Sequence, residues 1–318
     1  MTPHIPQLLE LSELVRFWRL PVQYFFNRRL KVFFDPSQGA LADDEPFSLD
    51  GLGRYQLREA LLSEFLNHQV MTQVSQGQLT KDQLFERFTA YQNAAGGLPL
   101  AEFGQLTLLE ERAQIEQLAE KVVQLMDHEQ PDVEVNLLVS IAGRQVQLQG
   151  WLKQYYQQGL IRYRPGKIRS NDILSGWIEH LCLACAGIEK STHLIGVDQH
   201  LVFNPLSREV AMLQLEALLE HYFQGLVQPL PYFPRTILAG LEAGRDKQGN
   251  WLTDEASIEK IFNKMAEGFN GGYMFDGEGI NHYIARVWPE WSQELAQEVY
   301  EMAEKLLKPA ISQLSEVK

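Results

Sequence analysis

A change of hydrophobic period near Pro131 constrains the fold of this chain more than any other feature of its sequence. Before it, apolar residues recur every three or four positions, as they do in amphipathic helices. Residues 133–163 instead alternate between apolar and polar positions, with interruptions at Ala142–Gly143 and Gln158–Gly159, which is typical of strands joined by tight turns. Helical spacing then returns from Ile173. The order predicts an α/β (α+β) fold, a small mixed β-sheet flanked by many helices.

Amphipathic helices are expected in the first part and in the last third of the chain. Pro21 permits a second helix to begin after the first, and Thr80 with Gln83 has the spacing of a capping box. Segment 192–203 is expected to form one further strand, and the glycine-rich segment 268–279 an irregular loop. The faces expected to be buried carry Leu11, Leu14, Val15 and Trp18; Leu57, Leu61 and Phe65; Leu84, Phe88 and Tyr91; and Ile115, Leu118, Val122 and Leu125. Later helices are expected at 173–186, 209–223, 235–242, 254–267 and 290–307.

The charge balance limits which partners the protein can bind without a specialised surface. The chain has 41 Asp and Glu against 28 Lys and Arg, a net charge of −13, which argues against indiscriminate binding to nucleic acid. Two cysteines cannot form a disulfide framework and are typical of a reducing compartment. Residues 1–13 lack the features of a signal peptide, and no run of ~18 apolar residues is long enough to cross a bilayer. These features predict a cytoplasmic protein with no membrane contact.

Two groups of potential nucleophiles or metal ligands have simpler interpretations. Cys182 and Cys185 form one CxxC spacing within an apolar helix, where both are expected to be buried as small hydrophobic residues. In the expected strand at 192–203, Asp198 and His200 would lie on one face and His193 on the other. No further ligands accompany them, so the sequence predicts polar residues satisfied by hydrogen bonds or solvent rather than a metal site.

Two acidic groups are also expected to be structural. Asp276 and Glu278 lie in the glycine-rich segment without the ligand spacing of a calcium loop. Four acids spaced along one side of the last long helix are typical of a solvated face, with a docking surface for a basic partner as the alternative. They are Glu290, Glu294, Glu298 and Glu301. No metal or cofactor site is predicted.

Positive charge is concentrated in one short segment. Arg162, Arg164, Lys167 and Arg169 fall within eight residues, at the end of an expected β-hairpin within residues 148–172. The order is a strand with a central glycine, a turn, a second strand and a long helix. It resembles the core of the PD-(D/E)XK nuclease fold found in RecB- and AddB-type exonucleases. In that family, carboxylates on the two strands hold the Mg²⁺ that activates water against a phosphodiester.

The resemblance implies that the metal-binding residues have been replaced. Lys153 stands where the family has its first metal-binding Asp, and Arg162 where it has the second carboxylate. Tyr163 matches the family's tyrosine, and Arg164 replaces its lysine. Because cations repel one another at short range, the resemblance implies that these positions cannot bind Mg²⁺ and that the fold has no nuclease activity.

Three longer segments, 11–34, 45–62 and 159–185, resemble the C-terminal domain of the RecC family, the gamma subunits of exodeoxyribonuclease V. The resemblance implies one nuclease-like domain, residues 1–318, that is a fragment of a longer chain. Its parts would be a mainly helical region at 1–130, a degenerate nuclease core at 131–205 and a helical C-terminal part at 206–318.

The function implied by this resemblance is a non-catalytic role in a bacterial RecBCD-type helicase–nuclease. Such a domain would scaffold the RecB and RecD subunits and guide split DNA, as a duplex end or as single strands, during double-strand-break repair and recombination. It would need no cofactor, since the iron–sulfur cluster of AddB-type relatives takes four cysteines and this chain has two. The expected location is the bacterial cytoplasm.

The basic positions allow two interpretations. Their side chains could form an anion site for a phosphate or a partner carboxylate, or they could simply make internal salt bridges or point to solvent. The candidates for contact with DNA or a partner are Lys153, Arg162, Arg164, Lys167 and Arg169, and, on the first two helices, Arg16, Arg19, Arg28 and Arg29.

Two other classes of protein are alternatives. An active metal-dependent exonuclease would need displaced carboxylates, such as Glu134, Asp172 or Glu179, to converge on one cation. An unrelated soluble protein-binding module would lack the mixed sheet of the nuclease-like fold.

Overall fold

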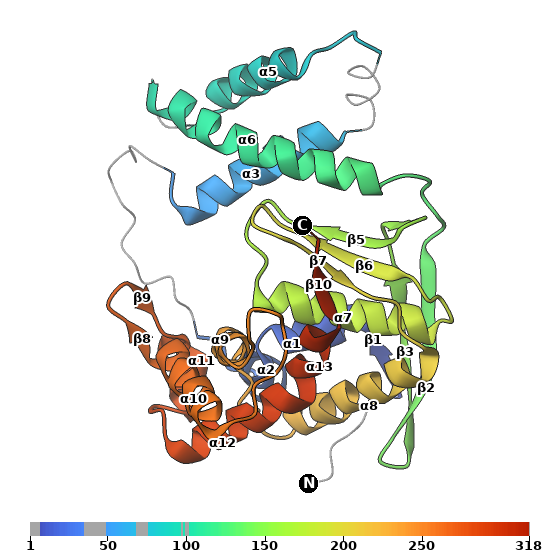
Figure 1. Cartoon of the computed structure of the whole chain (residues 1–318), viewed down its shortest axis with the longest axis vertical. Helices are drawn as coiled ribbons and strands as arrows, with labels where there is room; N and C mark the ends of the chain where they lie inside the picture. Colours follow the sequence, from blue (N-terminus) through green and yellow to red (C-terminus); the bar gives the residue numbers. More distant parts are fainter. Residues whose placement is uncertain (1–6, 35–48, 68–75, 97, 99–101, 318) are drawn as a thin grey trace.

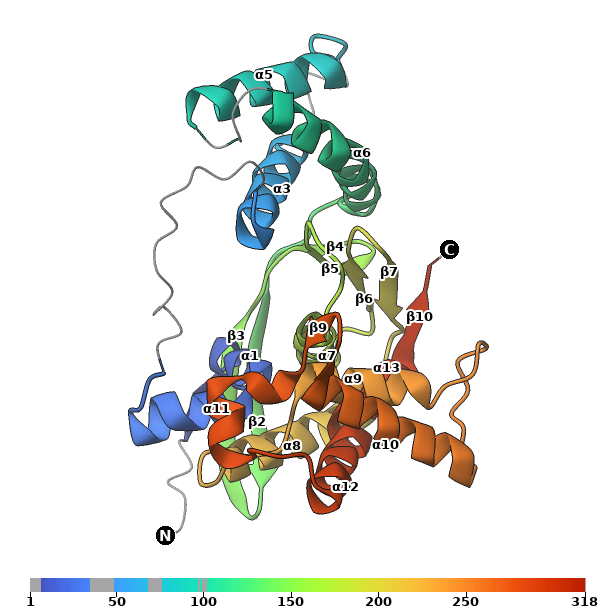
Figure 2. The same cartoon turned by 90° about the vertical axis from the view of Figure 1, so that its left-hand side faces the viewer.

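The computed structural model describes residues 7–34, 49–67, 76–96, 98 and 102–317. Of the segment 45–62 that resembles the RecC family, residues 45–48 lie outside these ranges. Helices α3 (Gly51–Leu66), α5 (Lys81–Ala94) and α6 (Glu102–Leu125) lie together at one end of the molecule (Figure 1). A five-stranded sheet separates them from the other helices, and a three-stranded sheet runs beside it (Figure 2). The predicted mixed α/β fold is confirmed.

The five-stranded sheet has the order β10-β7-β6-β5-β4. Strands β5 and β6 run parallel and are joined by helix α7, whereas the other neighbours are antiparallel. Gly159 begins β5 with φ 130°, and a Cβ there would lie 2.0 Å from the Ser191 carbonyl oxygen, so the close approach to β6 requires glycine. The bounds are β4 Tyr155–Tyr156, β5 Gly159–Tyr163, α7 Ser170–Cys185, β6 Ser191–Ile195, β7 His200–Phe203 and β10 Leu314–Glu316.

The three-stranded sheet consists of β1 (Leu8–Glu10), β3 (Arg144–Leu152) and β2 (Val133–Ile141), in that order. Strands β2 and β3 form an antiparallel hairpin whose tight turn, Ala142–Gly143, has two positive φ angles; the predicted interruption there is confirmed. A hairpin does form within residues 148–172, between β4 and β5, but the expected pairing of the strand that contains Gly150 with β5 is wrong, because β3 pairs with β2. Gln154, with φ 56°, lies where the chain passes from one sheet to the other.

The helical predictions are confirmed for most of the chain. Helix α1 (Leu11–Arg19) ends at Leu20 and α2 (Pro21–Tyr24) begins on the proline, and the capping box of Thr80 and Gln83 starts α5. The remaining helices are α8 Arg208–Gly225, α9 Pro234–Ala243, α10 Glu255–Asn270, α11 His282–Val287, α12 Gln293–Met302 and α13 Lys308–Gln313, with π-helical turns at Phe25–Leu30 and Ala303–Leu307. Within the described ranges, no helix is long and apolar enough to span a bilayer.

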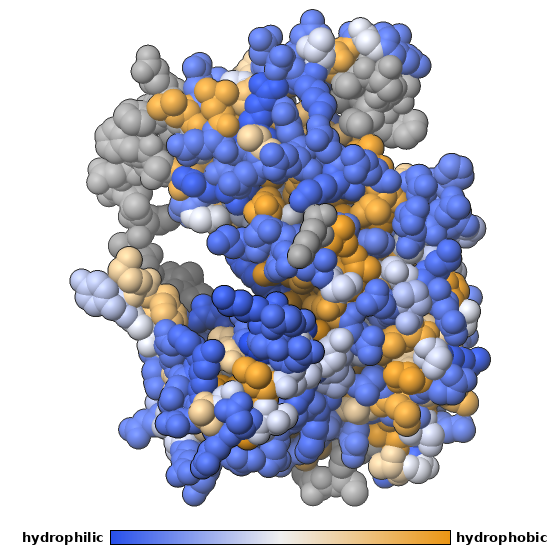
Figure 3. Space-filling view, in the orientation of Figure 1, coloured by the Kyte–Doolittle hydropathy of each residue, from blue (hydrophilic) through white to orange (hydrophobic). Residues whose placement is uncertain are grey.

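Two clusters of buried side chains lie on opposite faces of the five-stranded sheet. Successive residues of a strand point to opposite faces, so Leu160 joins the larger cluster with α7, whereas Ile161 joins the smaller cluster with α3, α5 and α6. Hydrophilic residues cover most of the face in Figure 3, and apolar residues reach it in separate patches, one of them where the upper helices meet the sheet.

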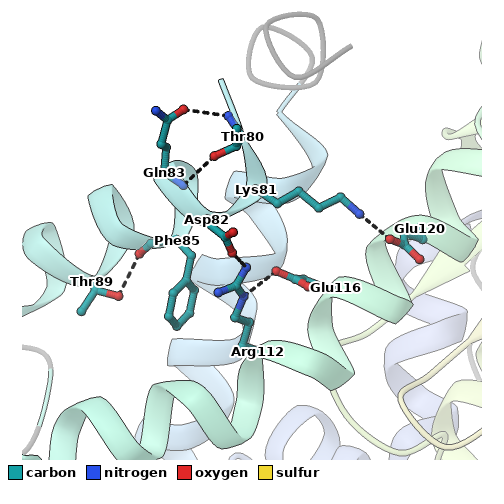
Figure 4. A network of polar contacts seen from close by, with 9 residues as sticks. All are labelled: Thr80, Lys81, Asp82, Gln83, Phe85, Thr89, Arg112, Glu116 and Glu120. Carbon is teal, nitrogen blue, oxygen red and sulfur yellow. Dashed lines mark hydrogen bonds and ion pairs between the residues drawn. The ribbon is translucent and has the colours of Figure 1, made fainter. Parts of the chain in front are cut away.

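Polar contacts supplement the apolar packing between α5 and α6. The Arg112 guanidinium donates to both Asp82 and Glu116 (Figure 4), and it lies over the Phe85 ring with 4.5 Å between the guanidinium carbon and the ring centroid. Hydrogen bonds to Glu116, the largest contribution, and Asp82 raise the pKa of Arg112 against the effect of its partial burial. Through Asp82, this network links α5 to α6.

Several local predictions are wrong. Segment 192–203 is a hairpin of β6 and β7 rather than one strand, and segment 268–279 contains the short strands β8 (Gly271–Gly272) and β9 (Phe275–Asp276) rather than an irregular loop. Tyr91 is 69% exposed, and Phe85 takes its place in the smaller cluster. The helix expected at 290–307 begins at Gln293 and changes to a π-helical turn at Ala303.

Candidate functional site

The candidate site lies where the carboxyl end of β5 meets α7. Arg162 is the fourth residue of β5 and points to the α7 side of the sheet, whereas its neighbours Ile161 and Tyr163 belong to the smaller cluster on the other face. Helix α7 presents Asp172 in its first turn and Glu179 two turns later. Arginine side chains at the end of β5 therefore lie beside acidic side chains of α7.

Arg162 is held by three acceptors. Its Nε donates to Glu179 Oε2 at 2.5 Å, and its Nη1 donates to the carbonyl oxygens of Lys153 at 2.9 Å and Ile161 at 3.0 Å. The side chains of Arg162 and Glu179 are 21% and 23% exposed. The guanidinium thus links the end of β3, β5 and α7, and Glu179 is neutralised.

Arg164 forms the second pair of the site. Its Nη1 donates to Asp172 Oδ2 at 2.5 Å, and the same oxygen accepts the Arg169 backbone N–H at 2.8 Å at the start of α7. The guanidinium carbon lies 5.5 Å from the centroid of the Tyr55 ring on α3. The Arg164 side chain is 14% exposed, and its Nε has no acceptor among the residues that the structure describes. Arg164 therefore joins β5, α7 and the upper helices.

These pairs line a depression of about 250 Å³ between α1, β5 and α7. Arg19 of α1 also lines it; this side chain is exposed and has no ion-pair partner in the described part of the chain. Arg19 further borders two neighbouring depressions, one of which includes Arg169 and Arg235. Three arginines against two acids make this depression locally basic on an acidic protein.

The remaining basic candidates fall into two groups. Arg16 and Arg28 both pair with Glu13, at 3.0 Å and 3.5 Å, and the Tyr24 hydroxyl donates to the same carboxylate at 2.5 Å. Burial, and then the hydrogen bond to Glu13, raises the pKa of Tyr24. The other candidates have exposed side chains: Arg29, Lys153, Lys167 and Arg169. All of these basic side chains are exposed, and among the described residues Arg16 and Arg28 differ from the others in having an ion-pair partner.

The displaced acids considered for an active nuclease do not converge on an open position. Glu134 lies opposite Trp151 in the three-stranded sheet, whereas Asp172 and Glu179 are each bound by an arginine. Within the described ranges, no group of three or more His, Cys, Asp or Glu residues could hold a metal ion. A divalent cation at this site would have to displace two guanidinium groups.

The other predicted groups are structural. Cys182 and Cys185 are buried, as predicted, and burial raises the pKa of both thiols, that of Cys185 to about 11. His193 and His200 do not point to opposite faces; they meet across the β6–β7 hairpin with 3.0 Å between Nδ1 and Nε2. Glu278 accepts the Thr236 N–H at 2.9 Å at the start of α9, so it acts as a helix cap.

Three side chains that contribute to this part of the structure were not identified from the sequence. Glu13 gathers two arginines and a tyrosine, Tyr55 stacks on Arg164, and His180 is fully buried in α7. A polar residue inside the apolar run of α7 is the one signal that could have identified His180; the other two look like ordinary surface positions of amphipathic helices.

The fold and site define a mixed α/β domain whose central depression is built on arginine–carboxylate pairs. The family model described as "RecC C-terminal domain" matches residues 6–245, and the chain belongs to this family. It is 31% identical over 307 residues to the RecBCD enzyme subunit RecC of Escherichia coli (strain K12), covering 96% of this chain and 26% of that relative. The RecC subunit of Haemophilus influenzae (strain ATCC 51907 / DSM 11121 / KW20 / Rd) is 25% identical over 305 residues, which are 93% of this chain and 24% of the relative. The chain thus spans about a quarter of the length of these curated relatives.

Proposed function

We propose that this chain is a non-catalytic, nuclease-like domain of a RecC-type subunit that belongs to an exodeoxyribonuclease V (RecBCD-type) holoenzyme in the bacterial cytoplasm. It scaffolds the RecB and RecD subunits and guides split DNA strands during double-strand-break repair and recombination. The observation that carries this proposal is that Arg162 and Arg164 are each bound to a carboxylate of α7, at positions that the resemblance assigns to a metal-binding carboxylate and to the family's lysine.

The proposal treats β3, β5, α7 and β6 as a degenerate PD-(D/E)XK core. The parallel pair β5–β6 joined by α7, followed by antiparallel β7, supports it. Residues 131–205 form this core in a single domain, with the mainly helical region 1–130 before it and the helical part 206–318 after it. In this arrangement Lys153, Arg162 and Arg164 occupy the positions of the former metal site.

The charges of this site do not suit Mg²⁺. Two unit charges ~4 Å apart interact by about 4 kcal/mol at a dielectric constant of ~20, and a divalent ion beside Arg162 and Arg164 would meet this repulsion more than once. The acids that could attract it, Asp172 and Glu179, are already neutralised. The site therefore fits a structural role, and no hydrolytic step is assigned to it.

The exposed arginines and lysines around the depression are the residues we propose for DNA or subunit contact. Arg19, Lys153, Lys167 and Arg169 have exposed side chains near the β5–α7 junction, and cations of this kind bind phosphates by neutralisation and counterion release. Arg162 and Arg164 hold the surface in place, since their guanidinium groups are engaged internally.

Fluorescence anisotropy of a labelled forked duplex, titrated with the chain in Mg²⁺ at several salt concentrations, tests this proposal. We expect binding that weakens with salt and intact DNA on a gel. Arg19→Ala and Arg169→Ala should each reduce the salt slope by about 1, because each removes one cation from a phosphate. Lys260→Ala removes an exposed cation of α10 and should leave the slope unchanged. Cleavage by the chain, abolished by Glu179→Gln, would instead identify an active nuclease; no binding at low salt would limit the role to protein–protein contact.

Restoring carboxylates should restore cation binding if the nuclease-like alignment is correct. In the Lys153→Asp, Arg162→Asp variant, Glu179 no longer has its partner and new acids lie beside it. We expect Mn²⁺ to raise the Tm of this variant but not of the unaltered chain, with about 2.7 kcal/mol of stabilisation at ~100 times its dissociation constant. Lys167→Asp, Arg169→Asp makes the same charge change on exposed residues; an equal rise in its Tm would contradict the alignment.

A further inference from the structure

A large open groove, unrelated to the arginine pairs, lies between α10 and α12. Its volume is about 1180 Å³, larger than the ~300–1,000 Å³ typical of small-molecule pockets. The floor is apolar: Ile258, Phe262 and Ala266 line it from α10, and Ala296 lines it from α12. The Phe262 ring also lies 5.3 Å from the Tyr300 ring, measured between centroids, which fixes its position in the floor.

The charges on the rim of this groove have one sign. Glu255 and Glu259 border it on α10 and Glu294 borders it on α12, and none of the described residues that line it is basic. All three carboxylates are exposed, and none forms an ion pair with a residue in the described ranges. First-turn acids such as Glu255 and Glu294 also favour their own helices, but Glu259 lies beyond the first turn and has no such role.

The arrangement along α10 is a stripe with helical spacing. Ile258, Phe262 and Ala266 recur at every fourth position and therefore form one row, inclined by about 26° to the helix axis. Lys260 and Lys264 lie more than about 100° around the helix from that row, and Lys264 is paired with Glu267. The groove thus presents an apolar row bordered by unpaired acids, with the lysines of α10 directed elsewhere.

We propose that this groove binds an amphipathic basic helix of a partner protein, with the apolar stripe of that helix on the Phe262 row and its lysines or arginines beside Glu255, Glu259 and Glu294. Helices that bind in grooves are anchored by residues at spacings of three and four, which matches the row on α10. Charge complementarity requires the polar face of the partner helix to be positive, and it increases the rate at which that helix associates with the groove. We take the partner to be a protein because of the scaffolding role proposed above.

The charge of the rim argues against other occupants. Nucleic acid would place phosphates against three unpaired carboxylates. A second copy docking groove to groove would oppose two acidic rims, since a twofold interface brings the same surface together from both chains. A small ligand would leave most of the open groove unfilled.

The test uses two fluorescein-labelled helical peptides of the same length as α10, 16 residues. Both carry leucines at spacings of three and four; one has lysines on the remaining face and the other glutamates. Fluorescence anisotropy with the 318-residue chain should show binding of the lysine peptide that weakens with salt, and binding at least about tenfold weaker for the glutamate peptide, a difference of ~1.4 kcal/mol.

Variants of the chain test whether the peptides bind in the groove between α10 and α12. Glu259→Lys, Glu294→Lys should reverse the preference between the peptides, and Phe262→Ser should weaken both. Glu298→Lys places the same charge on α12 outside the groove and should change the affinity less than about threefold. Circular dichroism of each variant checks that it is folded; if Phe262→Ser is not, the charge reversal alone decides.

Equal binding of the two peptides, no binding of either, or a preference unaffected by the charge reversal would overturn this proposal. A concentration-dependent dimer in sedimentation that the same variants dissolve would also overturn it, in favour of a second copy. These peptide measurements involve no DNA, so a failure here is distinct from a failure of the strand-guiding role.

Discussion

Replacing Arg164 by methionine is expected to lower the free energy of unfolding by about 2 kcal/mol, which lies within the range for the loss of a hydrogen bond to a charged group. The Arg164 side chain is 14% exposed and that of Asp172 is 33% exposed, so the carboxylate left behind would be partly solvated and would keep the Arg169 N–H as a donor. The stacking of the guanidinium on Tyr55 of α3 would disappear as well. Urea denaturation followed by circular dichroism measures the change.

Two further variants separate the ion pair from general effects of substitution. Lys167→Met removes an exposed cation three residues away and should cost less than about 0.5 kcal/mol. Adding Asp172→Asn to Arg164→Met should recover part of the stability, because the uncompensated carboxylate is then absent. If Arg164→Met is as stable as Lys167→Met, the pair contributes nothing and Arg164 is free for an external role.

Acidification is expected to destabilise the fold through buried histidines. His180 is fully buried, with Nδ1 2.9 Å from Thr192 Oγ1 and Nε2 3.0 Å from the Asn204 carbonyl oxygen. The carbonyl can only accept, so Nε2 carries the proton and Nδ1 accepts from the hydroxyl. Burial lowers the pKa of His180 to about 4, from its usual 6.5. The neutral form is thus strongly preferred in the folded protein.

The direction of the pH effect follows from the pKa of His180 in the folded protein and its usual pKa. Above pH 6.5 His180 is neutral in both states and has no effect; as the pH falls towards 4, only the unfolded chain takes up the proton, so stability declines. The shift corresponds to about 3 kcal/mol. Burial also lowers the pKa of His200 to about 4 and lowers that of His193, so these residues add to the same decline.

Urea midpoints between about pH 7 and about pH 4.5 measure this effect. His180→Gln should be less stable near neutral pH but should lose less stability on acidification, whereas His282→Gln, at an exposed position, should keep the full decline. An unchanged pH dependence in His180→Gln would show that the buried imidazole is not responsible.

Local signals in the sequence predict local structure well in this protein. The capping box of Thr80 and Gln83, the helix start at Pro21 and the turn at Ala142–Gly143 each depend on residues within one turn of chain, and each is confirmed. The buried cysteine pair follows equally from the apolar run of α7. In each case the interactions that determine the structure are between residues close together in the sequence.

Pairing between distant segments is where sequence reasoning fails. The alternation in residues 133–163 identifies strands but not their partners, so β3 could be assigned to β5 when it pairs with β2. In the same way, segment 192–203 alternates like a single strand, so the sequence does not reveal the hairpin that brings His193 next to His200.

In the candidate site, too, the residues could be predicted from the sequence but their contacts could not. Its four charged residues are identifiable from the sequence: the two arginines as the residues that stand for a metal ligand and for the family's lysine, and the two acids as possible displaced ligands. That Arg162 would meet Glu179, and Arg164 would meet Asp172, depends on how α7 lies against the end of β5. The contribution of Tyr55 depends on the packing of α3 over the sheet, which no local pattern encodes.

The two short strands β1 and β10 make folding of this chain dependent on very distant pairings. Glu10 of β1 and Gln149 of β3 hydrogen-bond across 139 residues, and Ser315 of β10 bonds to Val202 of β7 across 113 residues. Pairings this remote give a high contact order, which slows folding because closing the long loop costs entropy before the strands begin to stabilise each other. We therefore expect both sheets to acquire an edge strand late, which would leave the backbone groups of β3 and β7 unpaired and open to other chains until then.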